Sequence, residues 1–351
     1  MTEFFKNKKV FITGHTGFKG TWLCKILNHF GADITGYALA PESPSLFEIC
    51  EIEKNINNIY ADIRDLKQLN EAVSAIKPEI VIHMAAQPLV RDSYKNPVYT
   101  YETNVMGTVN ILEAVRQSGT VKSFLNVTSD KVYKNIESEY GYKETDELNG
   151  RDPYSNSKSC SELVTESYKK SFFGKTSTAI STARAGNVIG GGDFASDRII
   201  PDCIKAIQNK QKLIIRNPNS VRPYQHVVEA LFGYSIIIKK QFEDRKYEGN
   251  YNIGPEISDC IKTSELADLF FANFENADWE VKNNNEPHEA GFLRLDNSKI
   301  KKIFNWQPQI NIKKAVDMTA RWTKAYLKKE GFNEIMNKQI KEYKNLIGDI
   351  I

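Results

Sequence analysis

The stretch KVFITGHTGFKG, residues 9–20, decides the fold. Its apolar and β-branched start, Lys9 to Thr13, predicts a buried strand, and helical spacing follows to about Phe30. Three glycines at positions 14, 17 and 20 stand between them. Glycines suit a turn in which the backbone approaches a pyrophosphate and the helix packs closely on the sheet. The start of that helix also offers free N–H groups to phosphates. The stretch therefore predicts a dinucleotide site, with a plain strand-to-helix turn as the alternative.

Outward from this stretch, short β-branched runs alternate with helical patterns. Strands alternating with helices are typical of a parallel sheet covered on both faces. After Arg184 the pattern loosens, with loops at Gly190–Gly192 and Asn217–Asn219. We predict an α/β fold: a Rossmann-type doubly wound parallel sheet with a smaller C-terminal α/β substrate lobe. The expected strands are Ile34–Leu39, one beginning at Ile59, Glu79–Met84, Ser123–Thr128 and Thr178–Ala183, and the expected helices are Leu66–Ile76, Pro97–Gln117 and Pro153 to about Phe173.

Composition excludes several classes of function. The 351 residues carry a net charge of +3, which gives no basic field for nucleic acid. No apolar run approaches the roughly 20 residues of a membrane helix, and the first strand begins too early to leave room for a signal peptide. We therefore expect a cytoplasmic protein with reduced cysteines and no metal site, because the five cysteines form no C-x-x-C pair. These cysteines are Cys24, Cys50, Cys160, Cys203 and Cys260.

The end of the second expected strand bears on the choice of cofactor. An acidic residue there would hold the ribose 2′-hydroxyl of NAD, but Tyr37–Pro41 contains none. No Arg or Lys replaces it to favour a 2′-phosphate, so NAD remains the expected cofactor, loosely held. Asp62 and Ile63, after the third strand, are candidates to meet the adenine, although Asp62 is also a plausible helix cap.

Tyr154 and Lys158 lie one turn apart at the start of an expected helix. A lysine ammonium favours the phenolate of a nearby tyrosine, which can take a proton from an alcohol as hydride leaves its carbon. The expected strand that ends at Thr128 places Ser129 at the same sheet edge. Most Tyr-x-x-x-Lys matches are surface pairs, but this one follows a Rossmann half and a serine.

These features together resemble the extended short-chain dehydrogenase/reductases that modify nucleotide sugars, and among them the 4,6-dehydratases of the cytidine type. The resemblance covers nearly the whole chain. Its general marks are the glycine turn, Ala85–Gln87 and the Tyr154/Lys158 pair. Its closer marks are Pro44–Glu48, Gln87–Arg91, Ser129–Lys131, Arg184–Asp193 and Arg222–Val227.

The resemblance implies an internal redox cycle on CDP-glucose. Tyr154, assisted by Ser129 and Lys158, would oxidise C4 as NAD takes the hydride. Asp130 would protonate the departing C6 hydroxyl, and Lys131 would be the C5 base. Hydride return to C6 would give CDP-4-keto-6-deoxyglucose for deoxysugar biosynthesis. The alternative for Asp130 and Lys131 is a loop ion pair.

The resemblance also implies the binding residues, the domains and the assembly. Arg222 could instead be an interdomain strut, and a lone His226 is more often structural. The expected domains are a Rossmann domain, 1–185, to which about 224–254 return, and a nucleotide-sugar lobe, 186–223 with 255–351. A homodimer or homotetramer would form through the helices at 97–117 and 153–173. The implied cofactor residues are Gly14, Thr16, Gly17, Phe18, Gly20, Asp62, Ile63, Ala85, Ala86, Gln87, Asn104, Tyr154 and Lys158, and the implied substrate residues are Arg91, Asn187, Arg198, Arg222 and His226.

Three other functions stay open. A nucleotide-sugar 4-epimerase of the same fold needs the tyrosine and lysine but no acid and base for elimination, so Asp130 and Lys131 count against it. A 4,6-dehydratase acting on another nucleotide hexose would share every motif. A Rossmann sensor that binds a dinucleotide without chemistry would have little use for Ser129, Tyr154 and Lys158 together.

Overall fold

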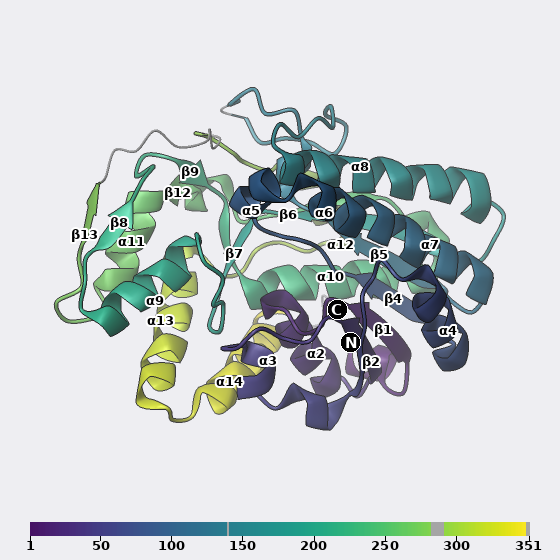
Figure 1. The fold of residues 1–351 in the computed structure, drawn as a ribbon, viewed down its shortest axis with the longest axis horizontal. Helices are drawn as coiled ribbons and strands as arrows, with labels where there is room; N and C mark the ends of the chain where they lie inside the picture. The colour runs from purple at the N-terminus through teal and green to yellow at the C-terminus, as the bar shows by residue number, and fades with distance from the viewer. Residues whose placement is uncertain (139, 282–290, 349–351) are drawn as a thin grey trace.

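A seven-stranded parallel sheet forms the centre of the computed structural model, which describes residues 1–138, 140–281 and 291–348 (Figure 1). Its order is β11-β6-β5-β4-β1-β2-β3, and every neighbouring pair is parallel. The order reverses at β1, beside β4, which is where open α/β sheets bind ligands. The strands are β1 Lys9–Thr13, β2 Asp33–Ala38, β3 Asn57–Tyr60, β4 Ile80–His83, β5 Ser123–Val127, β6 Ala179–Ala185 and β11 Asn250–Ile253.

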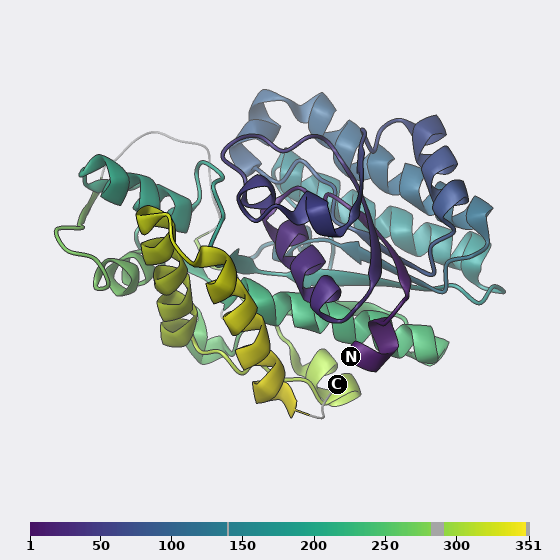
Figure 2. The same cartoon turned by 90° about the horizontal axis from the view of Figure 1, so that it is seen from below.

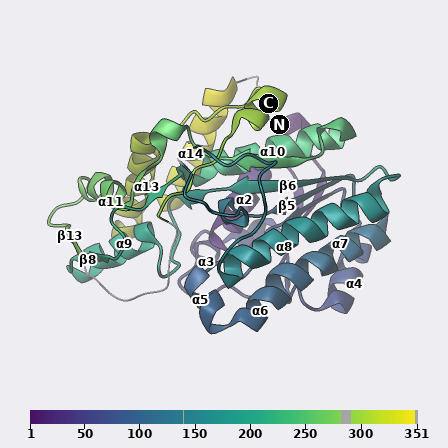
Figure 3. The ribbon, with the colours of Figure 1, turned by 90° about the horizontal axis from the view of Figure 1, so that it is seen from above.

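Helices cover both faces of this sheet, so its central strands are buried on both sides. Figure 3 shows α4, α7 and α8 on one face, with α10 on the other. The α2 and α10 face carries the larger apolar core, which continues into the C-terminal helices. The helices flanking the sheet are α2 Phe18–His29, α4 Leu66–Ile76, α6 Pro97–Tyr101, α7 Gly107–Ser118, α8 Pro153–Tyr168 and α10 Val227–Glu243, and the short helices α1 Thr2–Phe5, α3 Leu46–Ile49 and α5 Val90–Lys95 lie between them.

The segments after β6 build a second, smaller layer beyond the carboxyl ends of the strands (Figure 2). Three short two-stranded pairs join distant parts of the chain there: β7 with β10, β8 with β13 and β9 with β12. The chain returns to the main sheet through α10 and β11 before it ends in α13 and α14. These elements are β7 Asn187–Ile189, α9 Ile199–Asn209, β8 Leu213–Ile215, β9 Val221–Arg222, β10 Tyr224–His226, β12 Ile261–Lys262, α11 Thr263–Phe271, β13 Trp279–Val281, α12 Ser298–Phe304, α13 Ile312–Lys328 and α14 Phe332–Ile347.

Sequence patterns predicted most strands of the sheet but missed some boundaries of helices and strands. The predicted β1 and α4 match the structure residue for residue. The single helix expected over 97–117 is wrong in detail, because a π-helical turn, Glu102–Met106, separates α6 from α7. The third strand begins at Asn57, two residues before the expected start, because polar residues open this edge strand. In the part of the chain that the structure describes, no helix is long and apolar enough to cross a membrane.

Candidate functional site

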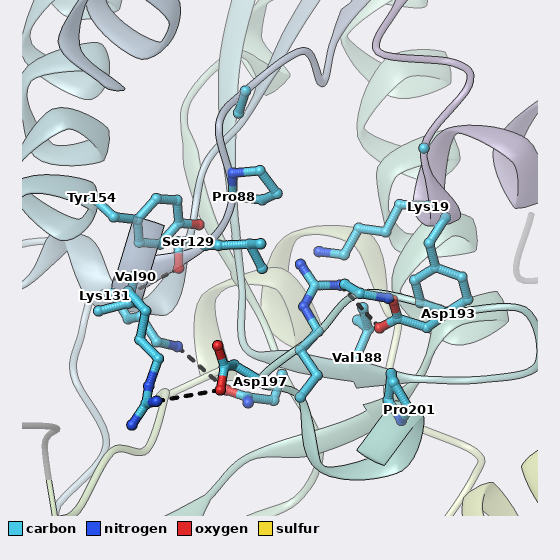
Figure 4. A pocket seen from close by; sticks show the side chains of 18 of the residues that line it. Lys19, Pro88, Val90, Ser129, Lys131, Tyr154, Val188, Asp193, Asp197 and Pro201 are labelled. Atoms are coloured by element: carbon cyan, nitrogen blue, oxygen red, sulfur yellow. Dashed lines mark hydrogen bonds and ion pairs between the residues drawn. The ribbon is translucent and has the colours of Figure 1, made fainter. Parts of the chain in front are cut away.

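A cleft of about 940 Å³ lies at the carboxyl edge of the sheet, between the Rossmann layer and the smaller layer. The glycine turn lines one end of it, and residues of α9 and β8 line the other. In Figure 4, Tyr154, Ser129 and Lys131 gather on one side of the cleft, and Lys19 and Asp193 lie on the other. Residues far apart in the sequence therefore share one solvent-filled space.

The glycine turn fits a dinucleotide because two of its positions leave no room for a Cβ atom. Gly14 has φ +77°, and a Cβ there would lie 2.6 Å from the backbone nitrogen of Ala85. A Cβ on Gly20 would overlap the carbonyl oxygen of Gly14. Gly17 caps α2 without a side chain, so the first N–H groups of the helix stay open to a phosphate. Thr16, Gly17 and Phe18 line the cleft as well.

No acidic residue stands at the end of β2, although Glu42, four residues further along, lines the cleft. Ala38, the last residue of β2, lines the cleft, and Thr16 donates a hydrogen bond to the Leu39 carbonyl at 3.0 Å. Asp62 also lines it, but Arg64 Nη2 holds its Oδ2 at 2.7 Å, and this hydrogen bonding lowers the pKa of Asp62. Asp62 therefore meets the cleft as part of an ion pair with Arg64.

Two predicted cofactor residues, Gln87 and Asn104, do not line the cleft but support its wall. Asn104 Oδ1 accepts from the Gln87 backbone N–H at 2.8 Å, and its Nδ2 donates to the Gln87 carbonyl at 3.1 Å. This clamp fixes the segment that follows β4. Ala85 and Ala86, directly before it, line the cleft as predicted. The π-helical turn after α6 carries Asn104 inward, which the sequence pattern did not indicate.

Helix α8 carries Tyr154 and Lys158 into the cleft. Asp152 caps the helix by accepting from the Ser155 N–H at 2.9 Å, and proline stands at its first position. Burial raises the pKa of Tyr154 to about 12, and a hydrogen bond with Ser129 opposes the shift. Burial lowers the pKa of Lys158 to about 8, and the charge of Glu162 opposes it. A cationic ligand beside Tyr154 would favour its phenolate.

Ser129, Asp130 and Lys131 lie together where β5 ends and a 3₁₀ turn begins. Asp130 Oδ1 accepts from Ser129 Oγ at 2.9 Å and from Lys131 Nζ at 3.0 Å. Asp130 is 1% exposed, and its Oδ2 has no hydrogen-bond partner among the described residues. Because the residue lines the cleft, this oxygen is a candidate to exchange a proton with a ligand. Lys131 Nζ also lies 3.3 Å from Asn187 Oδ1, so Asn187 joins this group.

Arginines from several elements line the cleft. Arg91 Nη1 lies 3.4 Å from Asp197 Oδ1, which Arg216 also contacts at 3.0 Å. Arg198 Nη1 lies 2.9 Å from Asp193 Oδ2. Arg222 lines the same region from β9 and is 7% exposed. These guanidinium groups suit a diphosphate. In the structure, ion pairs with Asp193 and Asp197 hold the guanidinium groups of Arg198, Arg91 and Arg216 in place.

His226 stands apart from the predicted substrate residues. It is fully buried, it does not line the cleft, and its Nδ1 accepts from the Val228 N–H at 3.4 Å to cap α10. Burial lowers its pKa to about 3. The structure therefore gives His226 a capping position.

Lys19 is a cleft residue that the sequence analysis did not select. It stands in the glycine turn, directly before Gly20, and burial lowers its pKa to about 7, with the Arg198 charge adding to the shift. Its Nζ lies 3.5 Å from the hydroxyl of Tyr234 on α10. A cation between two glycines of a phosphate-binding turn was the available signal. No signal in the sequence indicated the ion pairs of Asp193 and Asp197, because these pairs depend on contacts that form only in the folded chain.

Three kinds of group thus meet in one cleft: a turn shaped for a pyrophosphate, a tyrosine and lysine suited to moving a proton at an alcohol, and an acid and amine beside them. The first two suit redox chemistry with a dinucleotide. The third can protonate a leaving group and accept a carbon-bound proton. The arrangement can support oxidation and elimination on one bound substrate.

The profile of the GDP-mannose 4,6 dehydratase family matches residues 11–319. The chain is 44% identical over 349 residues to CDP-glucose 4,6-dehydratase of Salmonella typhimurium, with 97% of each chain covered. It is 27% identical to CDP-paratose 2-epimerase of Salmonella typhi, over 90% of this chain and 99% of that one. A solved structure of UDP-glucose 4-epimerase from Thermotoga maritima has the same fold, with a TM-score of 0.80, 19% identity, and 91% and 99% of the two chains covered. That of dTDP-glucose 4,6-dehydratase from Bacillus anthracis, in complex with NAD, has a TM-score of 0.77, 19% identity, and 92% and 98% covered.

The first prediction concerns the missing acid at the end of β2. We expect the purified protein to hold NAD at less than one equivalent and to bind NAD more tightly than NADP. Ala38→Asp, which places a carboxylate in the cleft at this strand end, should tighten NAD binding by about 10-fold, the effect of one charge-assisted hydrogen bond. Calorimetric titration with each dinucleotide measures it.

Ala38→Asn is the matched control, because it has nearly the same size and no charge. Equal gains for Asp and Asn would contradict the prediction, as would a wild type that prefers NADP or that retains a full equivalent of NAD.

Proposed function

The chain belongs to the GDP-mannose 4,6-dehydratase family of extended short-chain dehydrogenase/reductases, and we propose that it converts CDP-glucose to CDP-4-keto-6-deoxyglucose. The observation that carries this proposal is the position of Asp130 and Lys131 in the same cleft as Tyr154 and Lys158. A 4-epimerase needs only the second pair. The 44% identity to a relative named for CDP-glucose supports cytidine over another nucleotide.

The residues of the chain divide the reaction between them. Bound NAD would supply the hydride acceptor for C4 and the hydride donor for C6. Tyr154 removes the proton of the C4 hydroxyl, with Ser129 hydrogen-bonded to the hydroxyl of Tyr154 and the charge of Arg198 favouring its phenolate. The new ketone acidifies C5. Lys131 passes a proton to Asp130, whose Oδ1 it contacts at 3.0 Å, and the neutral amine then takes the C5 proton. Asp130 gives the proton it received to the departing C6 hydroxyl, so that water leaves.

The binding groups fit the two ends of this substrate and its cofactor. Gly14, Gly17 and Gly20 accommodate the dinucleotide pyrophosphate without a Cβ clash. Arg91, Arg198 and Arg222, which line the same cleft, would hold the substrate diphosphate. Asn187, bound to Lys131, would position that amine beside the sugar. Five cysteines that remain free thiols agree with a cytoplasmic setting.

We also propose that the protein forms a homodimer, alone or within a tetramer, through α6, α7 and α8. These helices lie side by side on one face (Figure 3). Apolar side chains stand exposed on them and on the π-helical turns Glu102–Met106 and Lys169–Phe173 that continue them: Val98 at 69%, Met106 at 50%, Leu163 at 56% and Phe172 at 50%. An apolar face of this kind suits a second copy, because a two-fold axis lets one patch meet itself.

The second prediction tests the proposed reaction and the role of Tyr154. Wild type incubated with CDP-glucose and NAD should give a product that absorbs in the near ultraviolet in alkali, as 4-keto-6-deoxy sugars do and epimers do not. Tyr154→Phe keeps the ring but loses the proton carrier, so turnover should fall by roughly 10²–10⁴ while CDP-glucose binding changes by less than a few-fold.

Tyr101→Phe is the control, because the Tyr101 hydroxyl binds Asn156 on the same helix, outside the cleft. Near-normal turnover in Tyr154→Phe would exclude the proposed proton transfer. An epimer as the wild-type product would favour the alternative enzyme.

The third prediction separates oxidation from elimination. Lys131→Ala should still oxidise C4 but stall before water leaves, because the C5 proton has no acceptor. Reduced nicotinamide should therefore accumulate on mixing with CDP-glucose, with little keto-sugar product. In heavy water, exchange at C5 of recovered substrate should fall below the wild-type level. Single-turnover absorbance and product analysis measure these three quantities.

Lys134→Ala serves as the control. Lys134 follows Lys131 by three residues, and it pairs with Glu147 on the surface. Normal elimination in Lys131→Ala would assign the C5 base to another group. Failure to form reduced nicotinamide would place Lys131 in binding or in oxidation instead.

The fourth prediction addresses assembly. Leu163→Glu introduces a charge into the exposed apolar face of α8 and should convert a dimer to a monomer, measured by light scattering after gel filtration. Leu346→Glu, at an exposed leucine on α14, should leave the assembly unchanged. An unchanged mass for Leu163→Glu would exclude this face as the interface.

A further inference from the structure

A buried ion pair lies behind the candidate catalytic residues and takes no part in the steps above. Glu162 on α8 and Arg184 on β6 are each 1% exposed. Arg184 binds both carboxylate oxygens, with Nε to Oε1 and Nη2 to Oε2 at 2.9 Å each. Taking two charges out of water is costly, and such a pair often stabilises a fold no better than apolar residues would. The position of this ion pair, directly behind the candidate catalytic residues, therefore suggests a role in function.

Besides bonds to Thr182 and to the Glu144 carbonyl, the pair makes two hydrogen bonds that reach the two ends of one short segment. The Thr128 hydroxyl donates to Glu162 Oε1 at 2.5 Å, and Arg184 Nη1 donates to the Tyr133 hydroxyl at 2.9 Å. Ser129, Asp130 and Lys131 lie between these two contacts. We name residues 128–133 the catalytic segment. The ion pair thus holds it at its first and last residues.

The same pair is tied to the helix that carries the redox residues. Glu162 follows Lys158 by one turn of α8, and Lys158 Nζ donates to the Val127 carbonyl at 3.2 Å, directly before the catalytic segment. The Glu162 charge favours the protonated form of Lys158. The other ionisable groups near Lys158 are Tyr154 on the same helix, His83 on β4 and Lys19 on α2.

We propose that Glu162 and Arg184 are positioning residues that hold the acid and base of elimination in register with the redox pair. The inference rests on the proposed function. Oxidation uses Tyr154 and Lys158 on α8 with help from Ser129, whereas elimination uses Asp130 and Lys131 of the catalytic segment, yet all of these groups must meet one sugar ring. A displacement of about 1 Å between such groups can reduce turnover by 10²-fold. The bidentate ion pair fixes the position of the catalytic segment relative to α8, because the planar guanidinium of Arg184 binds the Glu162 carboxylate in one orientation.

Tyr133→Phe tests the proposal without removing either charge. The ring of Tyr133 stacks on Tyr142, with centroids 5.3 Å apart, and that contact should survive. The variant cuts the link from Arg184 to the end of the catalytic segment, together with the bond that the Tyr133 hydroxyl donates to Asn252 at 2.6 Å. We expect kcat to fall at least 10-fold, KM for CDP-glucose to change less than 3-fold, and reduced nicotinamide to accumulate during turnover. The amount of NAD bound and the melting temperature should stay near wild-type values.

Tyr142→Phe is the matched control, because the Tyr142 hydroxyl in the same aromatic pair binds Asn135 rather than the ion pair. It should leave kcat and the level of reduced nicotinamide unchanged. Equal loss of kcat in the two variants would overturn the proposal, because the effect would then belong to the aromatic pair. A Tyr133→Phe enzyme with normal kcat, or one with raised KM and normal kcat, would also overturn it.

A double-mutant cycle connects the effect to Arg184. Arg184→Lys keeps the charge but cannot bind Glu162 in two places and also reach Tyr133, so it should reproduce the Tyr133→Phe phenotype. Adding Tyr133→Phe to it should reduce kcat less than 2-fold further, because the link is already cut. Independent, multiplying losses would overturn the proposal. Thr128→Val, which cuts the other link, tests the pair if Arg184→Lys does not fold, and its kcat should fall at least 10-fold; normal kcat in it would overturn the proposal.

The wild-type reaction separates this inference from the proposed function. A wild type that forms no 4-keto-6-deoxy sugar contradicts the proposed function and removes the basis of the inference. A wild type that forms it, with Tyr133→Phe turning over normally, contradicts the inference alone.

Discussion

The close packing of α2 on β1 is the constraint on which the rest of the structure depends. Because Gly20 has no Cβ, the helix comes into contact with the Gly14 carbonyl, and because Gly14 has none, its backbone approaches Ala85 after β4. These contacts bring the start of a helix against the ends of two neighbouring strands. The cleft begins there, and each residue that lines it farther on is placed relative to this turn.

The parallel sheet then determines which residues meet. Its central strands are buried on both faces, so their side chains have no access to a ligand until the strand ends. Polar residues for chemistry therefore come from the first residues after each strand, as Ser129 and Asp130 do after β5, or from a helix that begins there, as Tyr154 does. Arg198, Arg216 and Arg222 come from the smaller layer, which closes the cleft from the other side, whereas Arg91 comes from α5, after β4.

Local sequence signals were enough to predict the elements with strong patterns. The strand and glycine turn at 9–20 and the helix Leu66–Ile76 follow from hydrophobic spacing and capping residues that lie within them. The π-helical turn at Glu102–Met106 does not, because its cause is tertiary: Asn104 leaves the helical pattern to hold the backbone of Gln87. Helix propensity depends on local sequence alone, so it cannot indicate a distant partner such as Gln87.

The residues of the candidate site also fall into those that local sequence signals could predict and those that they could not. Tyr154, Lys158 and the Ser129–Lys131 segment were predictable because each has a short motif beside a strand or at a helix start. Asp197 was not, since its partners Arg91 and Arg216 come from opposite sides of the cleft and from distant parts of the chain. His226 shows the converse, because a polar residue beside a recognised motif serves there as a helix cap.

The unpartnered Oδ2 of Asp130 implies a conflict between stability and activity at this position. A buried polar oxygen without a hydrogen bond in the described part of the chain makes the folded state less favourable than a fully satisfied site would. A ligand hydroxyl that donates to this oxygen would remove the penalty, so ligand binding would regain the free energy that folding loses there. Stability alone would favour an apolar residue at position 130, and the carboxyl group is the cost in stability that the proposed acid brings with it.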